Sequence, residues 1–144
     1  MTKYAVPCLT HRGSMPMNGK FLVDTNVIIR LLRSDERAIE LFNQAESICI
    51  PVVVAGELFY GAEKSTRQQA NARIFSEFIS QYEVIEVDTA IAQKYGAVKA
   101  ELKKLGLAIP ENDLWIAATA IARQYTLISF DGHFSRINGL RVVA

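Results

Sequence analysis

Short apolar runs alternate with longer stretches of helical periodicity from residue 20 to the end of the chain. Five runs have the length and composition of buried strands, namely residues 21–23, 47–50, 84–87, 126–130 and 140–143. Apolar spacing and capping residues predict helices over 26–33, 35–45, 51–63, 67–81, 88–105 and 114–123. Short strands alternating with helices predict an α/β fold, with a central, mainly parallel sheet of four to five strands covered by helices on both faces.

The beginning of the chain lacks this pattern. Residues 1–19 show no periodicity and contain Pro7, Gly13, Pro16 and Gly19. These features predict a flexible N-terminal leader over residues 1–19 and a single domain over residues 20–144.

Composition narrows the class without naming a function. Half of the 144 residues are hydrophobic, and the formal net charge is +1, so no global electrostatic attraction to nucleic acid is expected. Two cysteines, Cys8 and Cys49, are too few for a disulfide scaffold and favour a reduced protein inside the cell. No apolar run approaches the roughly 18 residues of a membrane helix, and we therefore expect a cytoplasmic protein.

Four acidic residues stand out by their positions. Asp24 ends the first predicted strand and Asp131 follows the run 126–130, and ligands of parallel sheets gather at such strand ends. Asp113 falls in the first turn of a predicted helix, whereas Glu57 interrupts an otherwise apolar one. Each acid alone has an ordinary explanation as a turn residue, a helix cap or a surface residue.

Taken together, the four acids predict a cation site. Carboxylates gathered at one rim raise each other's pKa values unless a cation compensates their charge. Their hard oxygen ligands suit Mg²⁺ or Mn²⁺. A zinc site is disfavoured, because neither His11 nor His133 pairs with a cysteine at zinc-like spacing.

Four segments carry a resemblance to a known family. Residues 21–28 (FLVDTNVI) resemble the opening motif of the PIN domain, the fold of the VapC toxin ribonucleases. The later segments AGELFYGA, IPENDLWIAA and LISFDGHF are similar to its second, third and fourth motifs, at residues 55–62, 109–118 and 127–134. The resemblance spans residues 20–143 in the correct order, and Ser129 stands where the family commonly has threonine.

The resemblance implies an activity and partners. It implies a three-layer α/β/α PIN-like fold and an endoribonuclease that cuts single-stranded or structured RNA with Mg²⁺, or with Mn²⁺ in its place. Asp24, Glu57, Asp113 and Asp131 would be the catalytic metal ligands, and Asn26 and Ser129 would hold those carboxylates by hydrogen bonds. The family also implies a VapB-like antitoxin and a homodimer, as in a type II toxin–antitoxin pair.

Other interpretations remain open at this stage. Thr25 is a candidate helix cap, and His133 fits a surface or packing position better than a general base. A haloacid-dehalogenase-like phosphatase needs an aspartate two positions after Asp24. This chain has Asn26 there, which argues against that class. A PIN nuclease of RNA maturation, or a PIN-like module that binds RNA or protein without cutting it, fits the same motifs.

Overall fold

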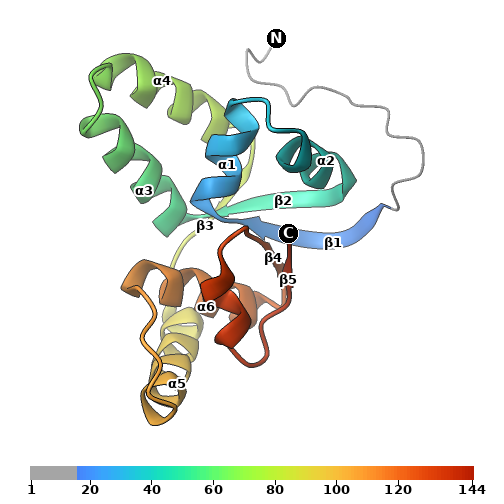
Figure 1. Ribbon diagram of the computed structural model, residues 1–144, viewed down its shortest axis with the longest axis vertical. Coiled ribbons are helices and arrows are strands. Elements are labelled where there is room, and N and C mark those ends of the chain that lie inside the picture. Colours follow the sequence, from blue (N-terminus) through green and yellow to red (C-terminus); the bar gives the residue numbers. More distant parts are fainter. Residues whose placement is uncertain (1–15) are drawn as a thin grey trace.

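The protein has an α/β architecture, seen here in a computed structural model that describes residues 16–144 (Figure 1). The strands are β1 (Met17–Val23), β2 (Ala45–Pro51), β3 (Glu83–Ile85), β4 (Thr126–Ile128) and β5 (Val142–Val143). The helices are α1 (Thr25–Leu32), α2 (Glu36–Gln44), α3 (Val52–Glu63), α4 (Gln68–Ile79), α5 (Thr89–Lys104), α6 (Glu111–Arg123) and the short 3₁₀ helix η1 (Gly132–Arg136).

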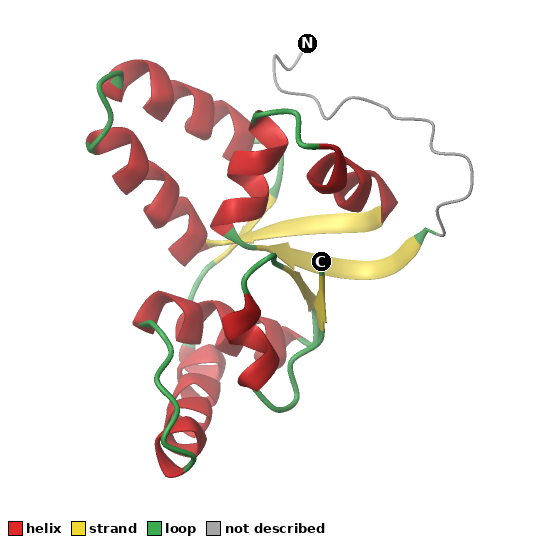
Figure 2. Ribbon diagram, viewed as in Figure 1, coloured by secondary structure: helices red, strands yellow, loops and turns green. Residues whose placement is uncertain are grey.

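The five strands form one sheet in the order β3-β2-β1-β4-β5, and neighbouring strands are parallel throughout. Helices α1 to α4 lie on one side of the sheet, and α5 and α6 lie on the other (Figures 1 and 2). This arrangement confirms the predicted three-layer α/β/α fold. The chain leaves β1 and β4 toward opposite faces, so their carboxyl ends form a topological switch point, where ligands bind in such folds.

The central strand β1 is apolar at its carboxyl end because helices cover it on both faces. Phe21, Leu22 and Val23 are all buried, and each pairs with residues of β4. Helix α6, which packs between the sheet and α5, buries almost its whole length from residue 114 to residue 120. Helices α1 and α2 instead bury a single stripe, as expected of surface helices.

Helix ends follow the capping residues of the sequence. The carboxylate of Asp88 accepts a hydrogen bond from the Ile91 amide at 2.9 Å, and Asp35 caps α2 through the Ala38 amide at 3.0 Å. Gly106, with a φ of +68°, follows the end of α5 in the left-handed region. Asp35 and Asp88 thus mark the starts of α2 and α5, and Gly106 marks the end of α5.

Several strand limits differ from the prediction. Strand β1 begins at Met17 rather than at residue 21, because its polar first half pairs with β2 at Met17–Ala45 and Lys20–Ser47. Residues 17–19 of the predicted leader thus belong to the sheet, and residues 1–15 lie outside the described residues. Strand β4 ends at Ile128 and β3 at Ile85, both earlier than predicted, because the chain turns toward the next helix there.

Two further expectations concern Cys49 and membrane helices. The Cys49 side chain is buried in β2 as a free thiol, where it is a small residue of the core. Cys8 lies outside the described residues. Among residues 16–144, no helix combines the length and the apolar character needed to cross a membrane.

The burial of β1 makes its core contribution testable. Leu22 is fully buried in the central strand. We expect Leu22→Ala to lower the free energy of unfolding by about 2–5 kcal/mol, because it removes apolar contacts and leaves a cavity. Leu105→Ala, at a position with 57% exposure, is the matched control, with an expected change of about 0.5 kcal/mol or less. Urea denaturation followed by circular dichroism measures both, and equal losses would contradict the assignment of β1 as the core strand.

Candidate active site

Four acidic side chains meet in one cavity at the carboxyl edge of the sheet. Asp24, Glu57, Asp113 and Asp131 all line this cavity of about 480 Å³. Asp24 follows β1 and Asp131 follows the end of β4, while Glu57 comes from α3 and Asp113 from the first turn of α6. The structure therefore brings together the acids singled out in the sequence, and their roles as metal ligands stay a prediction.

Asp24 is the most buried of the four and is held at both oxygens. Its Oδ1 accepts a hydrogen bond from the Thr25 amide at 2.8 Å, which caps α1, and its Oδ2 accepts one from the Ser129 hydroxyl at 2.8 Å. Burial raises the pKa of the Asp24 carboxyl above its ordinary value, and the negative charge of Asp131 adds to this effect. The hydrogen bonds from Ser129 and Thr25 oppose the rise.

Glu57 reaches the cavity from an otherwise apolar helix. The Thr25 hydroxyl donates a hydrogen bond to its Oε1 at 3.1 Å. Partial burial raises the pKa of Glu57; a hydrogen bond from Thr25 opposes the rise, while the charges of Asp24 and Asp113 add to it. Thr25 is thus a donor to Glu57, and the helix cap expected at Thr25 is Asp24 instead.

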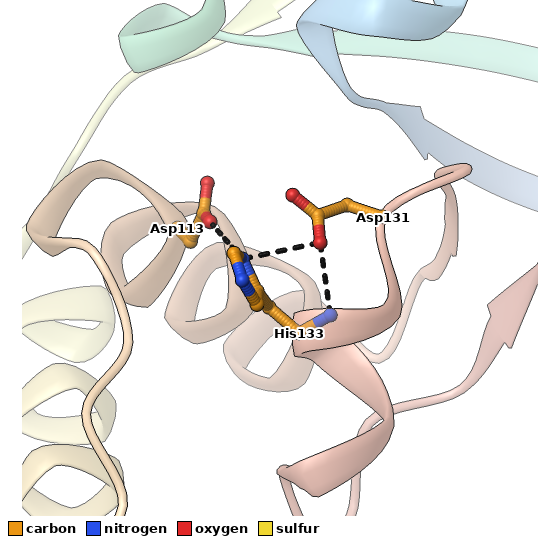
Figure 3. A group of neighbouring side chains, drawn as sticks. All are labelled: Asp113, Asp131 and His133. Carbon is orange, nitrogen blue, oxygen red and sulfur yellow. Dashed lines mark hydrogen bonds and ion pairs between the residues drawn. The ribbon is translucent and has the colours of Figure 1, made fainter.

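Asp113 and Asp131 face the ring of His133 (Figure 3). The Nδ1 atom of His133 lies 3.1 Å from Oδ1 of Asp131 and 3.5 Å from Oδ2 of Asp113. Burial raises the pKa of Asp113, and the charges of Asp24 and Asp131 raise it further, against an opposing effect of His133. The sequence analysis left His133 out of the site, and the structure places it in the cavity wall.

The predicted supporting residues have different outcomes. Ser129 contacts Asp24, and its hydroxyl also accepts a hydrogen bond from the Asp131 amide at 3.0 Å, so it connects the two strand-end acids. Asn26 lines the cavity, and its support of a carboxylate stays a prediction.

Sequence reasoning missed four polar residues of the cavity, Thr25, Glu111, Asn112 and His133. One signal was present for the last of these. Asp131 precedes His133 by two residues, which is the spacing of an Asx-turn. The Asp131 carboxylate does accept a hydrogen bond from the His133 amide, at 2.9 Å.

The charge of the cavity fits a divalent cation. Among the described residues that line it, none is lysine or arginine, whereas five are acidic once Glu111 is included. Several carboxylate oxygens at one rim are the donor set of Mg²⁺ or Mn²⁺. A bound cation would offset both the cost of burying these charges and the repulsion between them. The fold and the cavity together define a parallel α/β protein with an acidic site at the topological switch point.

The chain belongs to the PIN domain family, whose model matches residues 21–140. It is similar to Ribonuclease VapC2 of Haemophilus influenzae, with 35% identity over 127 residues that cover 85% of this chain and 95% of the relative. The tRNA(fMet)-specific endonuclease VapC of Salmonella typhimurium is 36% identical over 126 residues, covering 85% and 96% of the two chains. The crystal structure of DNA-bound VapBC from Salmonella typhimurium matches with a TM-score of 0.80 and 35% identity, covering 86% of this chain and 96% of that chain.

The raised pKa values predict how the metal-free protein responds to pH. Asp24, Glu57 and Asp113 bind their protons more tightly in the folded chain than in the unfolded chain. The metal-free fold is therefore destabilised at pH values above the raised pKa values, and this penalty disappears as the pH falls through them toward the ordinary values.

Asp24→Asn tests this effect, because asparagine keeps an acceptor oxygen and loses the charge. With EDTA present at neutral pH, we expect a higher thermal midpoint Tm for the variant than for wild type. The difference should narrow as the pH approaches the ordinary aspartate value of 3.8. Asp35→Asn changes a helix-capping aspartate outside the cavity and should give no increase. A Tm of Asp24→Asn at or below wild type at neutral pH would refute the electrostatic account.

Proposed function

We propose that this chain is a divalent-metal-dependent endoribonuclease that hydrolyses phosphodiester bonds of RNA in the cytoplasm. Mg²⁺ is the proposed ion, and Mn²⁺ is the alternative. The convergence of Asp24, Glu57, Asp113 and Asp131 in one cavity of a PIN domain is the observation that supports this function most directly. The catalytic domain proposed here covers the predicted residues 20–144 together with residues 17–19, which belong to β1.

The residues of the cavity divide the work between holding the ion and fixing the ligands. The four carboxylates would hold the ion directly or through water. A bound divalent ion supplies an activated water and neutralises charge on the phosphate oxygens. Ser129 and Thr25 fix the orientation of Asp24 and Glu57 through their hydroxyl groups, so these carboxylates need little rearrangement on binding.

Relatives support a toxin role for the enzyme. Several of the similar solved structures are VapBC complexes, including one from Rickettsia felis at 30% identity and a TM-score of 0.77. We therefore assign this chain to the toxin side of a toxin–antitoxin pair, with a VapB-like antitoxin as its partner. The homodimer implied by the family is part of this proposal. Since relatives are named as tRNA(fMet)-specific, initiator tRNA is the first substrate to assay.

Cleavage in vitro tests the chemistry. We expect the wild-type protein to cleave initiator tRNA or a pool of cellular RNA with Mg²⁺ or Mn²⁺, and EDTA to stop the reaction. Glu57→Gln should lower the cleavage rate at least about 100-fold, because it removes a charged metal ligand. Glu63→Gln, on the exposed end of the same helix α3, is the matched control and should cleave like wild type. Absence of cleavage by wild type with either ion would leave the non-catalytic binding module as the better account, and equal rates for the two variants would exclude Glu57 as an essential metal ligand.

Growth of the host tests the biological role. Induced expression of wild type should arrest growth, and Asp24→Asn should not, because the variant lacks a proposed metal ligand. Co-expression of a small DNA-binding protein encoded next to this gene should restore growth. Sequencing the 5′ ends of cleaved RNAs identifies the target. If wild type allowed normal growth and trimmed a precursor RNA, the maturation nuclease would replace the toxin.

A further inference from the structure

The ring of His133 contains a nitrogen, Nδ1, that is buried beside two carboxylates. Its Nδ1 atom is inaccessible to solvent and has no hydrogen-bond partner among the described residues, although the side chain as a whole is 45% exposed. Two carboxylate oxygens lie within ion-pair distance of it, at 3.1 Å on Asp131 and 3.5 Å on Asp113. A buried polar atom without a hydrogen-bond partner is costly, so this nitrogen calls for a partner.

The surroundings of this nitrogen have the dimensions of a metal site. Asp113, Asp131 and His133 each offer one ligand atom, and these atoms all lie within 4.8 Å of one another (Figure 3). Neighbouring ligands in an octahedron around Mg²⁺ are about 3 Å apart. The two distances from Nδ1 are close to this value, so Nδ1 is spaced from each of these oxygens like an adjacent corner of one coordination sphere.

The backbone fixes the ring beside the acids. The Asp131 carboxylate accepts a hydrogen bond from the His133 amide at 2.9 Å, and this bond caps the start of η1. The Asp131 amide in turn donates a hydrogen bond to the Ser129 hydroxyl at 3.0 Å. Phe134, the next residue, is fully buried and anchors η1 to the core. The imidazole is therefore positioned by the same turn that positions Asp131.

We propose that Nδ1 of His133 is a ligand of the divalent ion, together with Asp113 and Asp131, and that it shifts the preference of the site from Mg²⁺ toward Mn²⁺. This inference rests on the metal-dependent function proposed above and adds a residue and an ion preference to it. Mg²⁺ favours oxygen ligands only, whereas an imidazole nitrogen is a better ligand for transition metals. The proton of the neutral ring then resides on Nε2.

Pulsed electron paramagnetic resonance of bound Mn²⁺ tests the contact, using the full chain without a histidine tag. We expect a ¹⁴N coupling of the imidazole type in wild type and its loss in His133→Asn and in His133→Gln. The chain contains only two histidines, His11 and His133. His11→Asn is therefore the matched control and should keep the coupling. Circular dichroism shows that each variant is folded.

Calorimetric titration with each ion tests the preference. His133→Asn should weaken Mn²⁺ binding at least about ten-fold and change Mg²⁺ binding much less. Absence of the coupling in Mn²⁺-loaded wild type, or an equal loss of affinity for both ions, would overturn the inference.

These outcomes are separable from failure of the proposed function. If wild type binds Mn²⁺ and cleaves RNA without the coupling, His133 only lies near the ion and the nuclease assignment stands. If wild type neither binds Mn²⁺ nor cleaves RNA, both proposals are wrong.

Discussion

Burial of several carboxylates in one cavity, with their mutual repulsion added to it, is the constraint that the rest of the fold has to overcome. Three of these carboxyls have pKa values raised mainly by burial, so the metal-free protein is less stable at neutral pH than the same fold without their charges. Burial of the apolar residues of the adjacent sheet provides the stability that offsets this loss. Along β1 the change is abrupt, because the fully buried Val23 is followed at once by Asp24. The last residue of the buried strand and the first acid of the cavity are therefore adjacent in the sequence.

Two hydroxyl groups connect the acids that come from different parts of the chain. Ser129 donates to Asp24 and accepts from the Asp131 amide, so the ends of the neighbouring strands β1 and β4 are connected through one side chain. The Thr25 hydroxyl connects α1 to α3 by donating a hydrogen bond to Glu57. Because these hydrogen bonds form on folding, the carboxylates are already oriented when an ion arrives. Ligands held in this way lose little conformational freedom on binding.

Features set by local sequence were predictable, and features set by distant pairing were not. The apolar run 21–23, the Asp88 cap and the glycine after α5 each carry their own signal within a few residues. The first half of β1 has a polar sequence and becomes a strand only because β2 lies beside it. His133 likewise resembles an ordinary turn residue, and its proximity to Asp113, twenty positions earlier, depends on how α6 packs.

The switch point explains why the site needs the whole domain. Asp24 and Asp131 follow adjacent strands, whereas Glu57 arrives from the helical layer on one face and Asp113 from the layer on the other (Figure 1). The two layers contact each other beside the cavity through α3 and α6. A cation held by all four acids would therefore connect both layers to the sheet edge. Such an ion binds the folded chain and finds no assembled site in the unfolded one. Its binding would therefore stabilise the fold and offset the destabilisation caused by the buried acids.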